Sequence, residues 1–136
     1  MPDTRRPRTV VPETLRDLLT TDVLGHLTTK RADGSLAPSI VWVDFDGEHV
    51  LVSSPLGARK GRNVRADPHV ALSVVDHQDP FRYLQVRGRV TAIRPDADLE
   101  CIDRMSRRYR GTDYRDRRGE REVFEITIDH VRAAGG

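Results

Sequence analysis

The feature that most constrains the fold is a series of short apolar segments separated by tight polar turns. We predict strands over residues 23–30, 36–45, 49–53, 69–76, 81–93 and 122–128. Ala32-Asp33-Gly34 and Asp46-Gly47 each join two of these segments in the manner of β-hairpins. Gly88, inside the longest segment, indicates a bulge or a close backbone approach. Short hairpin connections predict a mainly β fold, an antiparallel sheet of six or so strands closed into a small barrel.

Three other segments have patterns typical of helices, which we expect on the flank of the sheet. Residues 12–20 place three leucines at helical spacing behind a proline, and residues 58–65 form a short basic helix or turn. Residues 96–109 follow Pro95 and carry an apolar face made of Leu99, Ile102, Met105 and Tyr109. We expect a flexible N-terminal arm, residues 1–11, followed by a single domain over residues 12–132.

Composition excludes several classes of protein. The 136 residues have a net charge of only +2, and 32% of them are charged, which fits a soluble globular protein and gives no bulk charge for nucleic acid. No apolar run approaches the roughly 18 residues that a membrane span needs, and the basic N-terminus lacks the apolar stretch of a signal peptide. Cys101 is the only cysteine, so we expect a helix-packing residue and a cytoplasmic protein without disulfides.

Motifs for several kinds of catalysis are missing. The five histidines show no HxxxH or CxxC spacing, so no metal site is expected. The chain has no GxSxG elbow for a hydrolase and no GxGxxG after a strand for a Rossmann nucleotide site.

The segment from Ser53 to Asn63 has the composition of an anion-binding turn. Two hydroxyls, Ser53 and Ser54, follow an apolar strand and precede a Pro, a Gly and a cluster of cations. Hydroxyls, exposed backbone N–H groups and converging cations are what a phosphate needs. Lysine occurs only at positions 30 and 60, so Lys60 marks a point where a compact charge is wanted. The alternative is a solvated loop with arginines on its surface.

Two other segments each have two interpretations. Residues 38–42 lie in a predicted strand in which Pro38 cannot donate a backbone hydrogen bond to a neighbouring strand. Trp42 at its end is either a core residue or the wall of an aromatic pocket. Arg104 to Arg121 holds eight arginines, which interspersed acids largely offset. This segment is a salt-bridged solvated face or a site for an anionic cofactor tail, with nucleic-acid binding as a minor option.

Four blocks of sequence carry a family resemblance. They are Gly25-His26-Leu27-Thr28-Thr29, Asp33-Gly34-Ser35-Leu36-Ala37-Pro38-Ser39, Arg59 to Leu72 with Arg-Lys-Gly-Arg-Asn and Asp-Pro, and Tyr83-Leu84-Gln85-Val86-Arg87-Gly88-Arg89-Val90. From about Leu15 to Val131 the chain resembles the pyridoxamine 5′-phosphate oxidase-like superfamily, whose fold is the FMN-binding split β-barrel. It looks most like the actinobacterial branch that uses the deazaflavin coenzyme F420.

The resemblance implies a homodimer with two cofactor sites at the subunit interface. It assigns the cofactor phosphate to Ser53, Ser54, Arg59 and Lys60, together with Arg62 and Asn63. It assigns the cofactor ring to Pro38, Ser39, Ile40, Val41 and Trp42. It expects the partner subunit to supply Phe81, Tyr83 and Gln85.

The resemblance also implies an activity: hydride transfer between F420 and a small unsaturated or quinone-like molecule. The cofactor performs this chemistry, so no catalytic acid–base pair is required. The alternatives are an FMN-binding oxidase or reductase of the same superfamily and a non-catalytic binder of flavin or F420. The chain ends at Gly136 without the further basic and aromatic segment of true pyridoxamine phosphate oxidases, so vitamin B6 oxidation is not expected.

Overall fold

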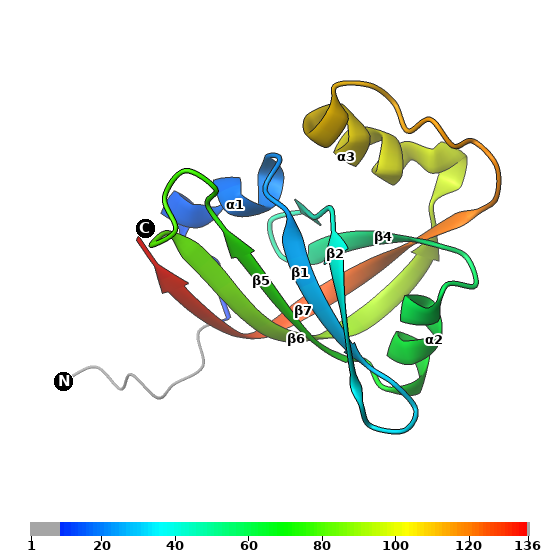
Figure 1. Cartoon of the computed structure of the whole chain (residues 1–136), viewed down its shortest axis with the longest axis horizontal. Helices are drawn as coiled ribbons and strands as arrows, with labels where there is room; N and C mark the ends of the chain where they lie inside the picture. The colour runs from blue at the N-terminus through cyan, green and yellow to red at the C-terminus, as the bar shows by residue number, and fades with distance from the viewer. Residues whose placement is uncertain (1–8, 136) are drawn as a thin grey trace.

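The computed structural model describes residues 9–135 and is built mainly from β-strands (Figure 1). The strands are β1 Gly25–Lys30, β2 Leu36–Val41, β3 Asp44–Phe45, β4 Val50–Pro55, β5 His69–Val75, β6 Tyr83–Pro95 and β7 Arg121–Ala134. The helices are η1 Glu13–Leu15, α1 Asp17–Thr20, α2 Arg59–Ala66, η2 Ala97–Leu99 and α3 Glu100–Arg110, of which η1 and η2 are 3₁₀ turns.

The strands form one antiparallel sheet in the order β2-β1-β5-β6-β7-β4-β3. β2 and β3 stand at opposite edges of this order, yet only Trp42 and Val43 separate them in the chain, so the sheet must curl until its edges approach. The inner face carries the main hydrophobic core, with Leu27, Leu84 and Phe124 fully buried. The prediction of a mainly β split barrel with flanking helices is therefore confirmed.

The predicted strand 36–45 is wrong in one respect, because it is two strands. Its first part ends at Val41, which pairs with Gly25, and its second part pairs with β4 at the other edge of the sheet. Between them the backbone N–H of Val43 donates to the hydroxyl of Tyr109 instead of to a strand (3.1 Å). A uniform apolar pattern cannot show this switch of partners.

The predicted helix 96–109 is also wrong at its start. Asp98 and Leu99 have positive φ angles of 55° and 58°, which separate η2 from α3. The carboxylate of Asp96 accepts the N–H groups of Cys101 (2.8 Å) and Ile102 (3.0 Å) and so caps α3 across this kink. As expected, Cys101 packs on the buried face of α3, and burial raises the pKa of its thiol to about 11.

The irregularity predicted at Gly88 is confirmed. The register between β6 and β7 shifts between Arg87 and Gly88. A Cβ at residue 88 would lie 2.3 Å from the carbonyl oxygen of Thr127, which only glycine avoids.

The predicted arm, residues 1–11, lies mostly outside the described residues, but Val11 is buried in the core. The start of the domain at residue 12 and its end at residue 132 stay predictions. Within residues 9–135, no helix combines the length and the apolar character needed to cross a membrane.

Candidate cofactor-binding site

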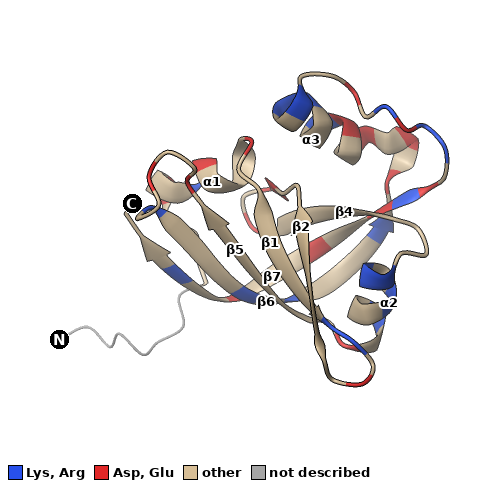
Figure 2. Ribbon diagram, viewed as in Figure 1, with Lys and Arg blue, Asp and Glu red and all other residues tan. Residues whose placement is uncertain are grey.

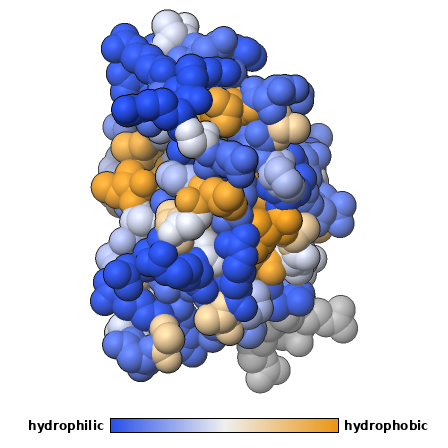
Figure 3. Space-filling model, turned by 90° about the vertical axis from the view of Figure 1, so that its right-hand side faces the viewer, coloured by the Kyte–Doolittle hydropathy of each residue, from blue (hydrophilic) through white to orange (hydrophobic). Residues whose placement is uncertain are grey.

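A hollow of about 200 Å³ collects residues from six parts of the chain. Its lining is Ile40, Val41, Trp42, Ser53, Lys60, Ile102, Met105, Tyr114 and Arg121. Five of these, the three from the end of β2 and its continuation together with Ser53 and Lys60, belong to the site predicted from the sequence. Figure 3 views the molecule from the α2 side, where separate hydrophobic patches lie within a mostly hydrophilic surface.

One end of the hollow is positively charged. Arg121 donates from Nε to the hydroxyl of the buried Ser53 (3.0 Å), which fixes the guanidinium at the end of β4. Burial lowers the pKa of Lys60, and the positive charge of Arg121 lowers it further. Neither cation forms an ion pair within residues 9–135. Two neighbouring cations without an acid create a favourable place for an anion.

One wall of the hollow is aromatic, and its rings are held by stacking and hydrogen bonds. Trp42 stacks on Tyr109 with ring centroids 5.2 Å apart, and Tyr114 meets Trp42 edge-on at 6.1 Å. Tyr109 donates its hydroxyl proton to the carbonyl of Val23, and burial raises its pKa. The guanidinium of Arg121 lies over the ring of Tyr114, 5.0 Å from its centre. The charged end and the aromatic wall are therefore in direct contact.

The loop between α3 and β7 is tied down by one buried carboxylate. Asp103 accepts the backbone N–H of Tyr114 (2.9 Å) and a guanidinium N–H of Arg117 (2.6 Å). The hydrogen bond from Arg117 lowers the pKa of Asp103. Asp103 thus sets the position of Tyr114 against Trp42 and Arg121.

Comparison with known proteins identifies the family. The family model for pyridoxamine 5′-phosphate oxidase matches residues 11–135. The chain belongs to the pyridoxamine 5′-phosphate oxidase family. No curated protein sequence matches it.

Solved structures of this family's fold agree. An F420 reductase is 32% identical, with a TM-score of 0.81 over 90% of this chain and 98% of its own. A conserved hypothetical protein from Mycobacterium tuberculosis is 21% identical, with a TM-score of 0.74 over 96% of this chain and 89% of its own. General stress protein 26 from Bacillus anthracis is 17% identical, with a TM-score of 0.70 over 90% of this chain and 92% of its own. The last two likenesses show the fold alone.

Other residues of the predicted phosphate turn hold the turn itself. Ser54 is fully buried and donates to the carbonyl of Pro55 (3.2 Å), and Arg62 donates to the carbonyl of Gly57 (2.8 Å). Asn63 is buried and donates to the hydroxyl of Thr29, which joins α2 to β1. Arg59 is exposed at the start of α2. Direct contact of these four residues with a ligand stays a prediction.

The other residues that the sequence predicted to bind the cofactor lie outside the hollow. Pro38 is exposed on the outer face of β2, and the hydroxyl of Ser39 is buried without a hydrogen-bond partner among the described residues. Tyr83 and Gln85 lie at the start of β6, where they pair with Val75 and Ser73 of β5, and Phe81 lies in the turn before this strand. These three were expected from a partner subunit, and that role stays a prediction.

Sequence reasoning missed four residues of the hollow: Ile102, Met105, Tyr114 and Arg121. Ile102 and Met105 were expected only as a core-facing helix stripe. Arg121 immediately precedes the predicted last strand, and β7 pairs with β4 so that Arg121 faces Pro55 and lies near Ser53. Had the pairing of these strands been known, Arg121 would have been found.

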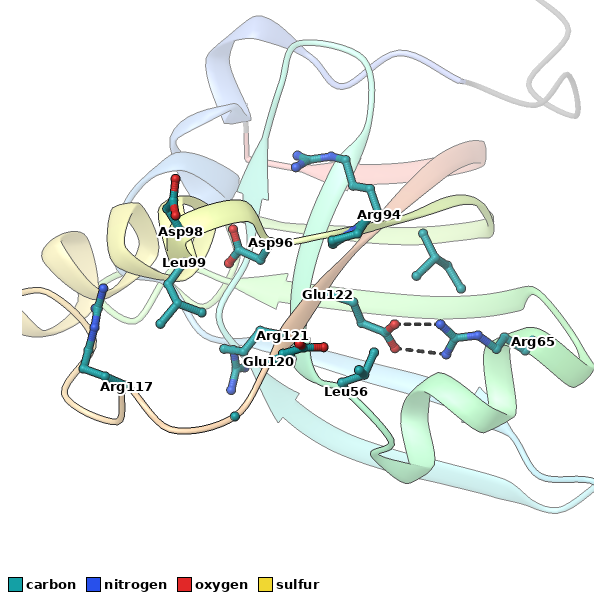
Figure 4. A pocket seen from close by; sticks show the side chains of 13 residues that line it. Leu56, Arg65, Arg94, Asp96, Asp98, Leu99, Arg117, Glu120, Arg121 and Glu122 are labelled. Atoms are coloured by element: carbon teal, nitrogen blue, oxygen red, sulfur yellow. Dashed lines mark hydrogen bonds and ion pairs between the residues drawn. The ribbon is translucent and has the colours of Figure 1, made fainter.

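A larger cavity, about 700 Å³, adjoins the hollow and shares Arg121 with it. In Figure 4 the guanidinium of Arg65 faces the carboxylate of Glu122 inside this cavity, with N–O distances of 2.6 and 3.0 Å. The hydrogen bond with the buried Glu122 raises the pKa of Arg65. Two further arginines of the lining, Arg94 and Arg117, pair with acids as well. The larger cavity therefore offers little uncompensated positive charge.

The arginine-rich segment from Arg104 to Arg121 follows the salt-bridged interpretation for most of its members. Five of its arginines form ion pairs with aspartates: Arg104, Arg107, Arg108, Arg117 and Arg118. Arg104 and Arg108 both hold the buried Asp44, which anchors α3 to β3. Arg121 is the arginine of this segment that lines the small hollow.

Proposed function

We propose that this chain is an F420-dependent oxidoreductase that transfers a hydride between the deazaflavin and a small unsaturated or quinone-like molecule. The observation that carries the proposal is that Lys60 and Arg121, which form no ion pair within residues 9–135, lie beside Ser53 and an aromatic wall. The likeness to an F420 reductase at 32% identity supports the choice of cofactor.

The residues of the hollow fit the parts of such a cofactor. Lys60, Arg121 and the hydroxyl of Ser53 would hold a phosphate, with two charges and directional donors. Ile40 and Trp42 would provide the apolar surface for a flat ring. When bound, the cofactor supplies the hydride, while the protein holds ring and acceptor in contact and keeps water away.

FMN is the second candidate cofactor, and one observation favours it. F420 carries an acidic oligoglutamate tail beyond its phosphodiester, whereas FMN ends in one compact phosphate. The arginines that could meet such a tail are mostly bound to aspartates, so the free charge near the hollow suffices for one phosphate.

Trp42 provides the test, because it is the only tryptophan and lines the hollow. Each cofactor is titrated into the protein while Trp42 fluorescence is followed. We expect F420 to quench it at lower concentration than FMN. Quenching by FMN but not by F420 would identify FMN as the cofactor, and the absence of quenching by both would overturn the proposed site.

Turnover is tested separately on the loaded protein. Reduced F420 is mixed with a panel of enones, quinones and nitroaromatic compounds, and oxidation of the cofactor is followed by absorbance. We expect at least one acceptor to speed this oxidation. Tight binding without turnover on any acceptor would instead support a non-catalytic binder.

We also propose a homodimer that packs through the outer face of the sheet. Leu36 and Ile40 of β2 are each 66% exposed there, a large value for apolar side chains. The register places Ile40, His26, Ser73 and Gln85 in one row across β2, β1, β5 and β6. A twofold axis near the middle of this row would bring Gln85 of a second copy close to Ile40 and the hollow. Light scattering at micromolar concentration tests it, and a monomer that binds cofactor tightly would refute the interface site.

A further inference from the structure

The outer face of the sheet carries a second group of cations, away from Lys60 and Arg121. Two neighbouring rows of side chains cross β1, β5, β6 and β7. One row is His26, Ser73, Gln85 and Arg132, and the other is Thr28, Ala71, Arg87 and His130. Figure 2 shows the basic residues in β6 and β7.

Arg87, His130 and Arg132 are close neighbours within these rows. Arg87 lies directly across from His130, and Arg132 directly across from Gln85. His130 and Arg132 are two residues apart on the same face of β7. Directly opposed residues have Cβ atoms about 5 Å apart, and diagonal neighbours about 7–8 Å. Two guanidinium groups and an imidazole can therefore reach one small ligand.

These cations lack the acids that accompany arginine elsewhere in the structure. Nine arginines of the described residues form ion pairs, namely Arg65, Arg82, Arg89, Arg94, Arg104, Arg107, Arg108, Arg117 and Arg118. Within residues 9–135, neither Arg87 nor Arg132 has an ion pair or a side-chain hydrogen bond. The one acid that lines this part of the face, Asp129, is held by Arg89 through two hydrogen bonds of 2.8 Å.

The surface is hollowed at this place. Two adjoining hollows of about 380 and 560 Å³ both include Thr28, Ala71, Arg87 and His130 in their lining. Ser73, Gln85 and Arg132 line the smaller one and add a hydroxyl, an amide and the second guanidinium. Planar guanidinium groups bind carboxylate and phosphate oxygens in pairs, and the neutral donors complete such a site.

We propose that Arg87, His130 and Arg132 form a binding site for a small multivalent oxyanion, a molecule with two or more phosphate or carboxylate groups. The site is separate from the hollow at Lys60. A second part of the inference rests on the dimer proposed above. In that dimer the bound anion lies between the two copies and offsets the repulsion between their facing arginines.

The experiment follows backbone amide and histidine ring signals by nuclear magnetic resonance. The full chain is titrated with pyrophosphate and, in a second arm, with citrate, which distinguish phosphate from carboxylate ligands. We expect the signals of Arg87, His130 and Arg132 to shift together. Arg87→Gln with Arg132→Gln should weaken binding by about tenfold or more, because charged hydrogen bonds are lost. Arg110→Gln, which removes an exposed arginine at the end of α3, is the matched control and should bind like the unaltered protein.

Several results would overturn the proposal. One is shifts confined to residues near Lys60 and Arg121, which would leave the cofactor hollow as the only anion site. Another is equal affinity for the unaltered protein and the double variant. Because both side chains are exposed, the double variant should not unfold at a lower temperature than the unaltered protein, which separates a lost site from a lost fold. Neither result depends on whether F420 or FMN occupies the hollow, so the two proposals fail independently.

Discussion

Replacement of Lys60 by methionine should weaken cofactor binding without weakening the fold. Lys60 is half-buried next to Arg121 and has no acid partner among the described residues, so its charge is unfavourable until an anion arrives. Methionine keeps an unbranched chain that can fill the same space, and it removes the charge. Affinity and stability should therefore respond in opposite directions, as expected where a site is built for binding.

The two effects differ in size. Loss of a charge-assisted contact to phosphate costs about 1.5–3 kcal/mol, which is about tenfold to a hundredfold in affinity. The free energy of unfolding should stay the same or rise by up to about 1 kcal/mol, because an unpaired, partly desolvated charge is removed.

The pH dependence has a definite sign. In the folded protein the pKa of Lys60 lies below its ordinary value of 10.5, so between these two values the unfolded chain binds more protons. The stability of the unaltered protein therefore gains a contribution from Lys60 as pH rises through this window. Lys60→Met should lack that contribution, so the free energies of unfolding of the two proteins should depend differently on pH below 10.5.

Urea unfolding measures the stability, and quenching of Trp42 fluorescence by cofactor measures the affinity. Arg31→Gln, in the exposed turn between β1 and β2, is the control and should change neither. Unchanged affinity in Lys60→Met would mean that the basic turn is ordinary surface. A clear loss of stability would mean that Lys60 has a structural partner, and the reasoning from unpaired charge would fail.

Three further predictions concern the loop that carries Tyr114, the bulge at Gly88 and the outer face of the sheet. Asp103→Ala should release the loop that carries Tyr114, so cofactor binding should weaken severalfold and the urea midpoint should fall. Asp113→Ala, which breaks an exposed ion pair, should change neither quantity, and equal effects of the two substitutions would contradict the role of Asp103. Gly88→Ala should lower the free energy of unfolding by about 1–3 kcal/mol, because its Cβ meets the carbonyl of Thr127, and an unaffected melting temperature would show that the bulge can relax. Neutralisation of the outer face by Arg87→Gln with Arg132→Gln should strengthen association of the apo-protein in light scattering, and weaker association would place these arginines in favourable contacts.

Local patterns in the sequence predicted much of the fold. Alternating apolar residues and Gly-containing turns located the strands, and the basic cluster located α2. Predictions failed where the chain changes its partner without a change of pattern. Residues 42–43 pass from one edge of the sheet to the other, and positive φ angles at Asp98 and Leu99 interrupt a helical pattern. The first accompanies a contact with the distant Tyr109, and the second accompanies the cap that Asp96 forms on α3.

The sequence by itself determined which residues could bind an anion, and tertiary structure decided which of them are free to do so. The basic turn and its two serines are local features, since hydroxyls and cations adjacent in the chain stay adjacent in the fold. Arg121 lies 68 residues from Ser53 and meets it only because β7 pairs with β4. Glu122, the next residue of β7, pairs with Arg65 of α2, whereas the pairing of β6 with β7 places Arg87 opposite His130 and Arg132 opposite Gln85, with no acid partner among the described residues. The effect of a charge depends on its neighbours in space, which are set by strand pairing over long distances in the chain.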